Sequence, residues 1–100
     1  MGTGLSVDAS HLAAICQANH IRRLSLFGSA LHANLRADSD VDVLVEFEVG
    51  HVPGLLGMSR IARELSAVFG GRTVDLRTPE DLSLYFRDKV LAEAEVQYAA

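Results

Sequence analysis

The chain has 100 residues, enough for one folded domain over residues 1–100 but too few for an additional substrate-binding domain. Nine Lys and Arg residues against 13 Asp and Glu residues give a formal net charge of −4, so we expect no direct binding of nucleic acid. No basic segment followed by an apolar run begins the sequence, and no apolar stretch approaches the roughly 20 residues of a membrane span. We therefore expect a cytoplasmic protein that does not cross a membrane.

The first predicted element is a helix that begins after Ser6 or Asp8, since either side chain can cap it. Leu12, Ile15 and Cys16 recur at helical spacing and indicate its buried side. Cys16 is the single cysteine of the chain, so no disulfide can form within it. Its apolar neighbours favour a buried structural thiol over a nucleophile.

A strand is predicted over Ile21 to Phe27, and it ends at Gly28-Ser29, before a short predicted helix over Ser29 to Leu35. Glycine allows the backbone to approach a ligand closely. The following serine can cap the helix and offer its hydroxyl and N–H groups to a phosphate. The order of strand, Gly-Ser turn and helix is typical of phosphate sites, although Gly-Ser also opens ordinary turns.

A second strand is predicted over Val41 to Phe47, where apolar and other residues alternate. Asp40 and Asp42 are two residues apart, so they share the face opposite the valines, about 6.5–7 Å apart. Two carboxylates this close repel each other unless a cation lies between them, and Mg²⁺ binds through one or two carboxylates and substrate phosphates. The pair indicates a metal site, with a solvated strand start as the alternative.

The strongest helical periodicity covers Leu55 to Phe69, followed by Gly70-Gly71 as a stop. Its apolar positions are Leu55, Met58, Ala62, Leu65 and Phe69. Arg72 to Arg77 then alternates as a third strand, with Asp75 on its polar face. Asp75 is placed as a metal ligand or catalytic base would be, and an ion pair with a neighbouring arginine is the alternative.

The run Thr78-Pro79-Glu80-Asp81 is typical of a helix start, with Asp81 placed as the acid of a capping box. A last helix is predicted over Arg87 to Val96. These elements indicate an α/β (α+β) fold in which a small mixed sheet of about three core strands is flanked by helices.

The four histidines lack the spacing of a zinc site. They are His11, His20, His32 and His51. His32 follows Ser29 by three residues, so it is a candidate phosphate contact, with a surface helix histidine as the alternative.

The pattern of Gly28-Ser29, ten further residues, Asp40-x-Asp42 and a later Asp75 in a Val-Asp-Leu strand resembles the polymerase-beta-type nucleotidyltransferase superfamily. This resemblance implies the nucleotidyltransferase fold.

Within that superfamily, the chain length and two runs resemble the minimal nucleotidyltransferases (MNT), over roughly Leu24 to Val96. The two runs are Gly54 to Met58 and Val74 to Pro79.

The resemblance also implies a role for each motif residue. Gly28 and Ser29 would hold the triphosphate of ATP, and Asp40 and Asp42 would bind Mg²⁺ ions. Asp75 would complete the metal site and help to deprotonate the acceptor hydroxyl. This is the arrangement of a two-metal transfer to a phosphate centre.

Minimal nucleotidyltransferases of this kind are commonly antitoxins of an all-helical HEPN-type ribonuclease toxin. The resemblance implies transfer of AMP from ATP to a tyrosine hydroxyl of that partner, within a homo- or hetero-oligomer. The family's run after Gly-Ser usually contains arginines, whereas Ala30 to Asn34 contains none. A catalytically weak or inactive module that neutralises the toxin by binding is therefore the alternative, and a small-molecule acceptor bound with another chain ranks third.

Overall fold

The structure is a computed structural model that describes residues 7–31 and 39–100, without the side chain of Ser29. Its four-stranded sheet has the order β3-β2-β1-β4, in which only the β2–β3 pair is parallel. The elements in chain order are α1 (Ala9–Ala18), β1 (Ile21–Leu26), the 3₁₀ turn η1 (Gly28–Leu31), β2 (Val41–Phe47), α2 (Leu55–Val68), β3 (Val74–Arg77), the 3₁₀ turn η2 (Pro79–Asp81), α3 (Leu84–Glu93) and β4 (Glu95–Ala99).

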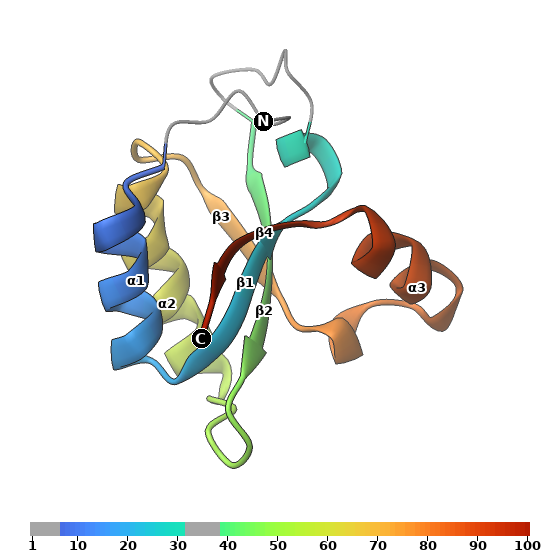
Figure 1. Cartoon of the computed structure of the whole chain (residues 1–100), viewed down its shortest axis with the longest axis horizontal. Helices are drawn as coiled ribbons and strands as arrows, with labels where there is room; N and C mark the ends of the chain where they lie inside the picture. The colour runs from blue at the N-terminus through green and yellow to red at the C-terminus, as the bar shows by residue number, and fades with distance from the viewer. Residues whose placement is uncertain (1–6, 32–38) are drawn as a thin grey trace.

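The helices lie on both sides of the sheet (Figure 1). Helices α1 and α2 cover one face, whereas α3 lies on the opposite side. Residues buried between the sheet and α1 and α2 form the main core, in which Val43, Val45 and Leu65 are fully buried. Burying a side chain of this kind contributes about 1.5–3 kcal/mol. The alternation predicted for Val41 to Phe47 is confirmed with the same bounds.

Helix α1 begins where the sequence predicts, because the Asp8 carboxylate accepts from the N–H groups of Ser10 and His11, both at 3.1 Å. Ser6 lies outside the described residues. Cys16 has no exposed surface, which confirms the prediction of a buried thiol. Burial raises the pKa of the Cys16 thiol to about 11, because the thiolate would lose its hydration.

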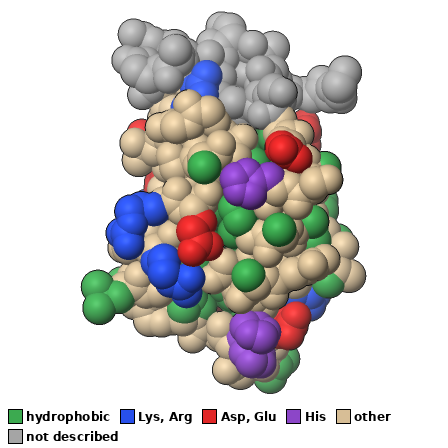
Figure 2. Space-filling model, turned by 90° about the vertical axis from the view of Figure 1, so that its left-hand side faces the viewer, with side chains coloured by type: hydrophobic (Ala, Val, Ile, Leu, Met, Phe, Trp, Pro, Cys, Tyr) green, Lys and Arg blue, Asp and Glu red, His purple; other side chains and the backbone are tan. Residues whose placement is uncertain are grey.

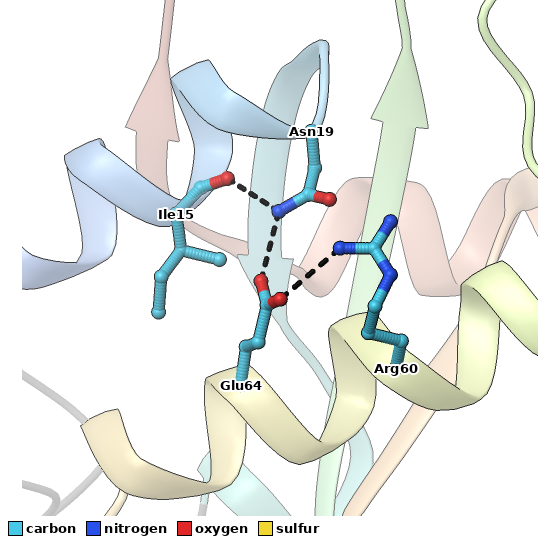
Figure 3. Close-up of polar contacts among 4 residues, drawn as sticks. All are labelled: Ile15, Asn19, Arg60 and Glu64. Atoms are coloured by element: carbon cyan, nitrogen blue, oxygen red, sulfur yellow. Dashed lines mark hydrogen bonds and ion pairs between the residues drawn. The ribbon is translucent and has the colours of Figure 1, made fainter.

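The end of α1 is tied to α2 by a buried asparagine (Figure 3). The Nδ2 atom of Asn19 donates to the Ile15 carbonyl at 2.8 Å and to the Glu64 carboxylate at 3.0 Å. Arg60 donates to the other oxygen of the same carboxylate at 3.1 Å. These contacts fix the turn from which β1 starts.

Helix α2 agrees with the prediction except at its first turn. Gly70 and Gly71 adopt φ values of 71° and 85°, which end the helix, as predicted. The prediction that Leu55 faces inward is wrong, because this side chain is 88% exposed. Ile61, which the spacing argument omitted, is buried instead.

The C-terminal part of the chain differs most from the prediction. The last helix spans Leu84–Glu93, and Ala94 turns extended, so the predicted helix over Arg87 to Val96 is wrong at both ends. Residues Glu95–Ala99 pair with β1 as a fourth strand that the sequence analysis missed. The predicted capping box exists, with Asp81 as the acid, but it caps the short turn η2 and not the last helix. No helix in the described segments is long and apolar enough to cross a membrane.

Candidate active site

Two of the three predicted aspartates meet where β2 and β3 begin. Asp42 and Asp75 are register partners in the parallel β2–β3 pair. Each follows a buried valine, so both carboxylates point to the sheet face opposite α1 and α2. Neighbouring strands lie about 4.8 Å apart, which places the two acidic side chains next to each other.

Gly28 lies directly against one of these carboxylates. Its φ is 61°, and a Cβ atom at this position would lie 2.6 Å from Oδ2 of Asp42. The N–H group of Phe27 donates to the Asp42 carbonyl at 3.1 Å, which holds the end of β1 beside the start of β2. The glycine is therefore required twice, for its left-handed conformation and for the space that the carboxylate occupies.

Asp40 lies one residue before β2, at the same end of the sheet, and its side chain is exposed. The next residue, Val41, donates its N–H group to the carbonyl of Thr73 at 2.9 Å. This bond fixes the chain beside Asp40 next to the segment that enters β3.

Asp75 already has a partner on its own strand. The Arg77 guanidinium lies 3.4 Å from Oδ2 of Asp75, and both side chains are partly exposed. The ion pair that the sequence analysis gave as the alternative therefore exists. An exposed pair of this kind is worth about 0–1 kcal/mol, so it does not prevent a stronger ligand from binding to Asp75.

The phosphate half of the predicted site is described only in part. Ser29 belongs to η1 by its backbone, but its side chain lies outside the described part of the chain. His32, and Arg36 as the first arginine after Ser29, also lie outside the described residues.

A cavity of about 290 Å³ opens beside Gly28. It is lined by Phe27 and Gly28 on one side and by Phe86, Lys89, Val90 and Glu93 of α3 on the other. The start of α3 is held in place by Arg87, which donates to the carbonyls of Pro79 and Leu82 at 2.7 and 3.2 Å. The sequence does not predict that Lys89 lies in a cavity with Gly28, because no spacing relates α3 to the Gly-Ser turn.

The chemistry of these donors fits a hard divalent cation. Asp42 and Asp75 offer carboxylate oxygens from adjacent strands, and oxygen is the ligand atom that Mg²⁺ prefers. Asp42 and Asp75 are therefore the candidate metal ligands that the structure brings together, and Asp40 lies two residues before Asp42.

Comparison with known proteins agrees with this geometry. Residues 10–99 match the family model described as polymerase beta, nucleotidyltransferase. The protein adenylyltransferase MntA of Thermococcus cleftensis is 33% identical over 88 residues, which cover 88% of this chain and 86% of the relative.

Solved structures share the fold. One that is provisionally described as a minimal nucleotidyltransferase aligns with a TM-score of 0.69 and 34% identity, over 86% of this chain and 85% of that one. A complex of a tri-AMPylated Shewanella oneidensis HEPN toxin with an MNT antitoxin aligns with a TM-score of 0.59 over 92% of this chain and 70% of that one. Its 17% identity shows a common fold alone. The family match over nearly the whole chain confirms the resemblance found in the sequence, and the chain belongs to the polymerase beta nucleotidyltransferase family.

Proposed function

We propose that this protein transfers AMP from ATP to a hydroxyl group, on a tyrosine, of a HEPN-type toxin and thereby acts as its antitoxin. The observation that carries the proposal is the pairing of Asp42 with Asp75, with Gly28 packed against the first carboxylate. The relative named as a protein adenylyltransferase and the solved complex with an AMPylated HEPN toxin support the choice of acceptor.

In this proposal, Asp40, Asp42 and Asp75 hold Mg²⁺, which when bound lowers the pKa of the acceptor hydroxyl and offsets phosphate charge. The acceptor oxygen forms a bond to the α-phosphorus of ATP, and the bond from that phosphorus to the leaving pyrophosphate breaks. Asp75 accepts the proton of the hydroxyl. Gly28 and Ser29 bind the triphosphate through their backbone N–H groups, since glycine allows the backbone to approach a ligand closely.

Lys89 is our candidate for the positive charge that is missing after Ser29. It lines the cavity beside Gly28, whereas the run from Ala30 to Asn34 contains no arginine. An ammonium group at this position offsets part of the charge of a bound triphosphate.

The outer surface of α3 fits a protein acceptor. Leu84, Tyr85 and Phe86 are 78%, 93% and 62% exposed, and Phe86 lines the cavity. Contiguous exposed apolar side chains mark surfaces that another protein covers. A folded partner docked on α3 would bring its own hydroxyl group to the carboxylates. ATP is a cytoplasmic metabolite, so we place the reaction in the cytoplasm.

Incubation of the protein with labelled ATP, Mg²⁺ and the toxin encoded by the neighbouring gene tests this function. We expect label in the toxin, and none when Asp40→Ala and Asp42→Ala are combined or when Mg²⁺ is chelated. Unchanged transfer in the double variant would contradict the catalytic role of the carboxylates.

Neutralisation by binding alone is the second candidate, and the apolar surface of α3 favours it. An assay of toxin activity separates the two functions, with calorimetry as the control that the toxin is still bound. A variant with Asp40, Asp42 and Asp75 all replaced should still bind the toxin under either one. Toxin that stays inhibited by this variant supports binding alone, whereas toxin that regains activity supports AMP transfer.

A further inference from the structure

A second group of ligand-type side chains lies at the opposite end of β2. His20 follows α1, Glu48 follows β2, and His51 lies in the loop before α2. One ligand atom from each residue lies within 4.8 Å of the others, and all three residues are exposed. Figure 2 shows histidine and acidic side chains together at the lower edge of the face that carries α1 and α2. Spacing along the sequence does not indicate this group, because the fold brings His20 and His51 together. We propose that this His-Glu-His trio binds a divalent transition metal ion such as Zn²⁺.

The distances are close to those of a metal site. Nδ1 of His20 lies 3.6 Å from a carboxylate oxygen of Glu48. Ligand atoms around a tetrahedral zinc ion are about 3.3 Å apart, given zinc–ligand distances near 2.0–2.2 Å. The three ligand atoms therefore need to close by about 1.5 Å at most. Rotations of exposed side chains supply such a movement without a shift of the backbone.

The two imidazole rings must also turn. They are stacked, with 3.9 Å between the ring centroids of His20 and His51 and 15° between their planes. A metal ion lies close to the plane of each imidazole that binds it, so parallel rings have to open into a wedge. Both rings are at the surface, and a rotation about the Cβ–Cγ bond is a soft motion.

The backbone holds the three residues together before any ion binds. The N–H group of Glu48 donates to the His20 carbonyl at 2.9 Å, and the N–H group of His51 donates to the Glu48 carbonyl at 3.0 Å. The turn that carries His20 is fixed on its other side by the buried side chain of Asn19. His20 itself adopts φ of 58°, a conformation that few residues other than glycine adopt. The ligands are thus positioned by a hydrogen-bonded turn, which lowers the entropic cost of binding.

The donor atoms select the metal. Two imidazole nitrogens and one carboxylate oxygen suit Zn²⁺, Ni²⁺ and Co²⁺, whereas Mg²⁺ prefers oxygen ligands alone. The trio lies about 20 Å from Asp42, since six residues of extended chain separate Asp42 from Glu48. The inference is therefore independent of AMP transfer. A bound ion would cross-link the turn before β1 to the loop before α2, and we expect it to raise the melting temperature.

Calorimetric titration with Zn²⁺ in a buffer that contains excess Mg²⁺ tests the site. Excess Mg²⁺ competes for the carboxylate end, so Zn²⁺ binding reports on the His-Glu-His trio. We expect one equivalent to bind, with affinity more than roughly tenfold lower in His20→Ala and in His51→Ala. His11→Ala removes an exposed histidine from α1 and serves as the matched control, with unchanged affinity.

Two further variants keep the test decisive. Glu48→Gln retains the size of the side chain and should also weaken binding, and Asp42→Asn should leave Zn²⁺ binding intact. The absorption spectrum of Co²⁺ should show d–d bands of nitrogen ligation that disappear in His51→Ala. Equal Zn²⁺ affinity in the wild type and both histidine variants, or a loss of equal size in His11→Ala, would overturn the proposal.

Discussion

The two ends of strand β2 present different ligand chemistry. At its start, Asp42 lies beside Asp75 and Gly28, and these positions follow from strand register. Beyond its end, Glu48 lies beside His20 and His51, whose positions follow from turns. The first end offers oxygen atoms to a hard cation, and the second adds imidazole nitrogen, which suits a transition metal.

The difference shows how a small sheet can separate two sites. A strand of seven residues spans about 23 Å, which exceeds the screening length of about 8 Å at physiological ionic strength. Charge changes at one end therefore have little effect at the other. The following predictions test whether the two ends are as distinct as their chemistry indicates.

The largest effect is expected at the start of β2. Asp42→Asn should reduce AMP transfer by roughly 100-fold or more, because an amide cannot replace a carboxylate whose charge stabilisation is worth several kcal/mol. His20→Ala, at the other end, should retain wild-type transfer. The measurement is the initial rate of label incorporation into the toxin, and a residual rate above a tenth of wild type in Asp42→Asn would refute the assignment.

Gly28→Ala separates the two requirements for glycine at this position, which are the left-handed backbone and the space that the Asp42 carboxylate occupies. Gly70→Ala is the matched control, since φ is 71° there and no neighbour lies within 4 Å of the added Cβ. Both substitutions should lower the free energy of unfolding by about 1–2 kcal/mol through the left-handed backbone. Only Gly28→Ala also displaces the Asp42 carboxylate, so it alone should reduce transfer, by roughly tenfold. Urea unfolding measures the loss of stability, and the initial rate of label incorporation measures AMP transfer. Equal transfer in the two variants would contradict the importance of the contact between Gly28 and Asp42.

Lys89→Met should raise the KM for ATP by roughly fivefold, which corresponds to about 1 kcal/mol for a partly solvated charge contact. The control is Arg63→Met, which removes an exposed positive charge from α2 on the other face of the sheet. The KM of the control should match that of the wild type. Equal KM values in both variants would show that the cavity beside Gly28 does not use this cation.

The smallest effect is expected for His51→Ala, whose transfer rate should stay within about twofold of wild type at saturating ATP. A larger decrease in this rate, in a variant whose circular dichroism spectrum is unchanged, would show that the two ends of β2 are coupled.

The carboxylate end could be predicted because it depends on local periodicity. Alternation in Val41 to Phe47 fixes which way Asp42 points, and the same argument holds for Asp75. That the two strands are adjacent and in register could not be derived from spacing, and it entered through the family resemblance.

Other features lacked a local signal. The segment Glu95–Ala99 is short and partly polar, and its pairing with β1 decides that it is a strand. The stacking of His20 on His51 depends on a left-handed turn and on a loop hydrogen bond, neither of which a spacing rule detects. Lys89 lines the cavity beside Gly28 because of the position of α3, which the Arg87 contacts hold in place.

The strand order β3-β2-β1-β4 also has a kinetic consequence. Pairing of β4 with β1 joins Arg23 to Ala99, and pairing of β2 with β3 closes a loop that contains the whole of α2. Such long-range contacts raise the contact order, and we expect folding to be slower than for a helical bundle of the same size. The antiparallel β1–β2 pair can form earlier, with Gly28 already against Asp42. The second carboxylate arrives only when β3 docks, so the Mg²⁺ affinity of this carboxylate pair would report on the docking of β3.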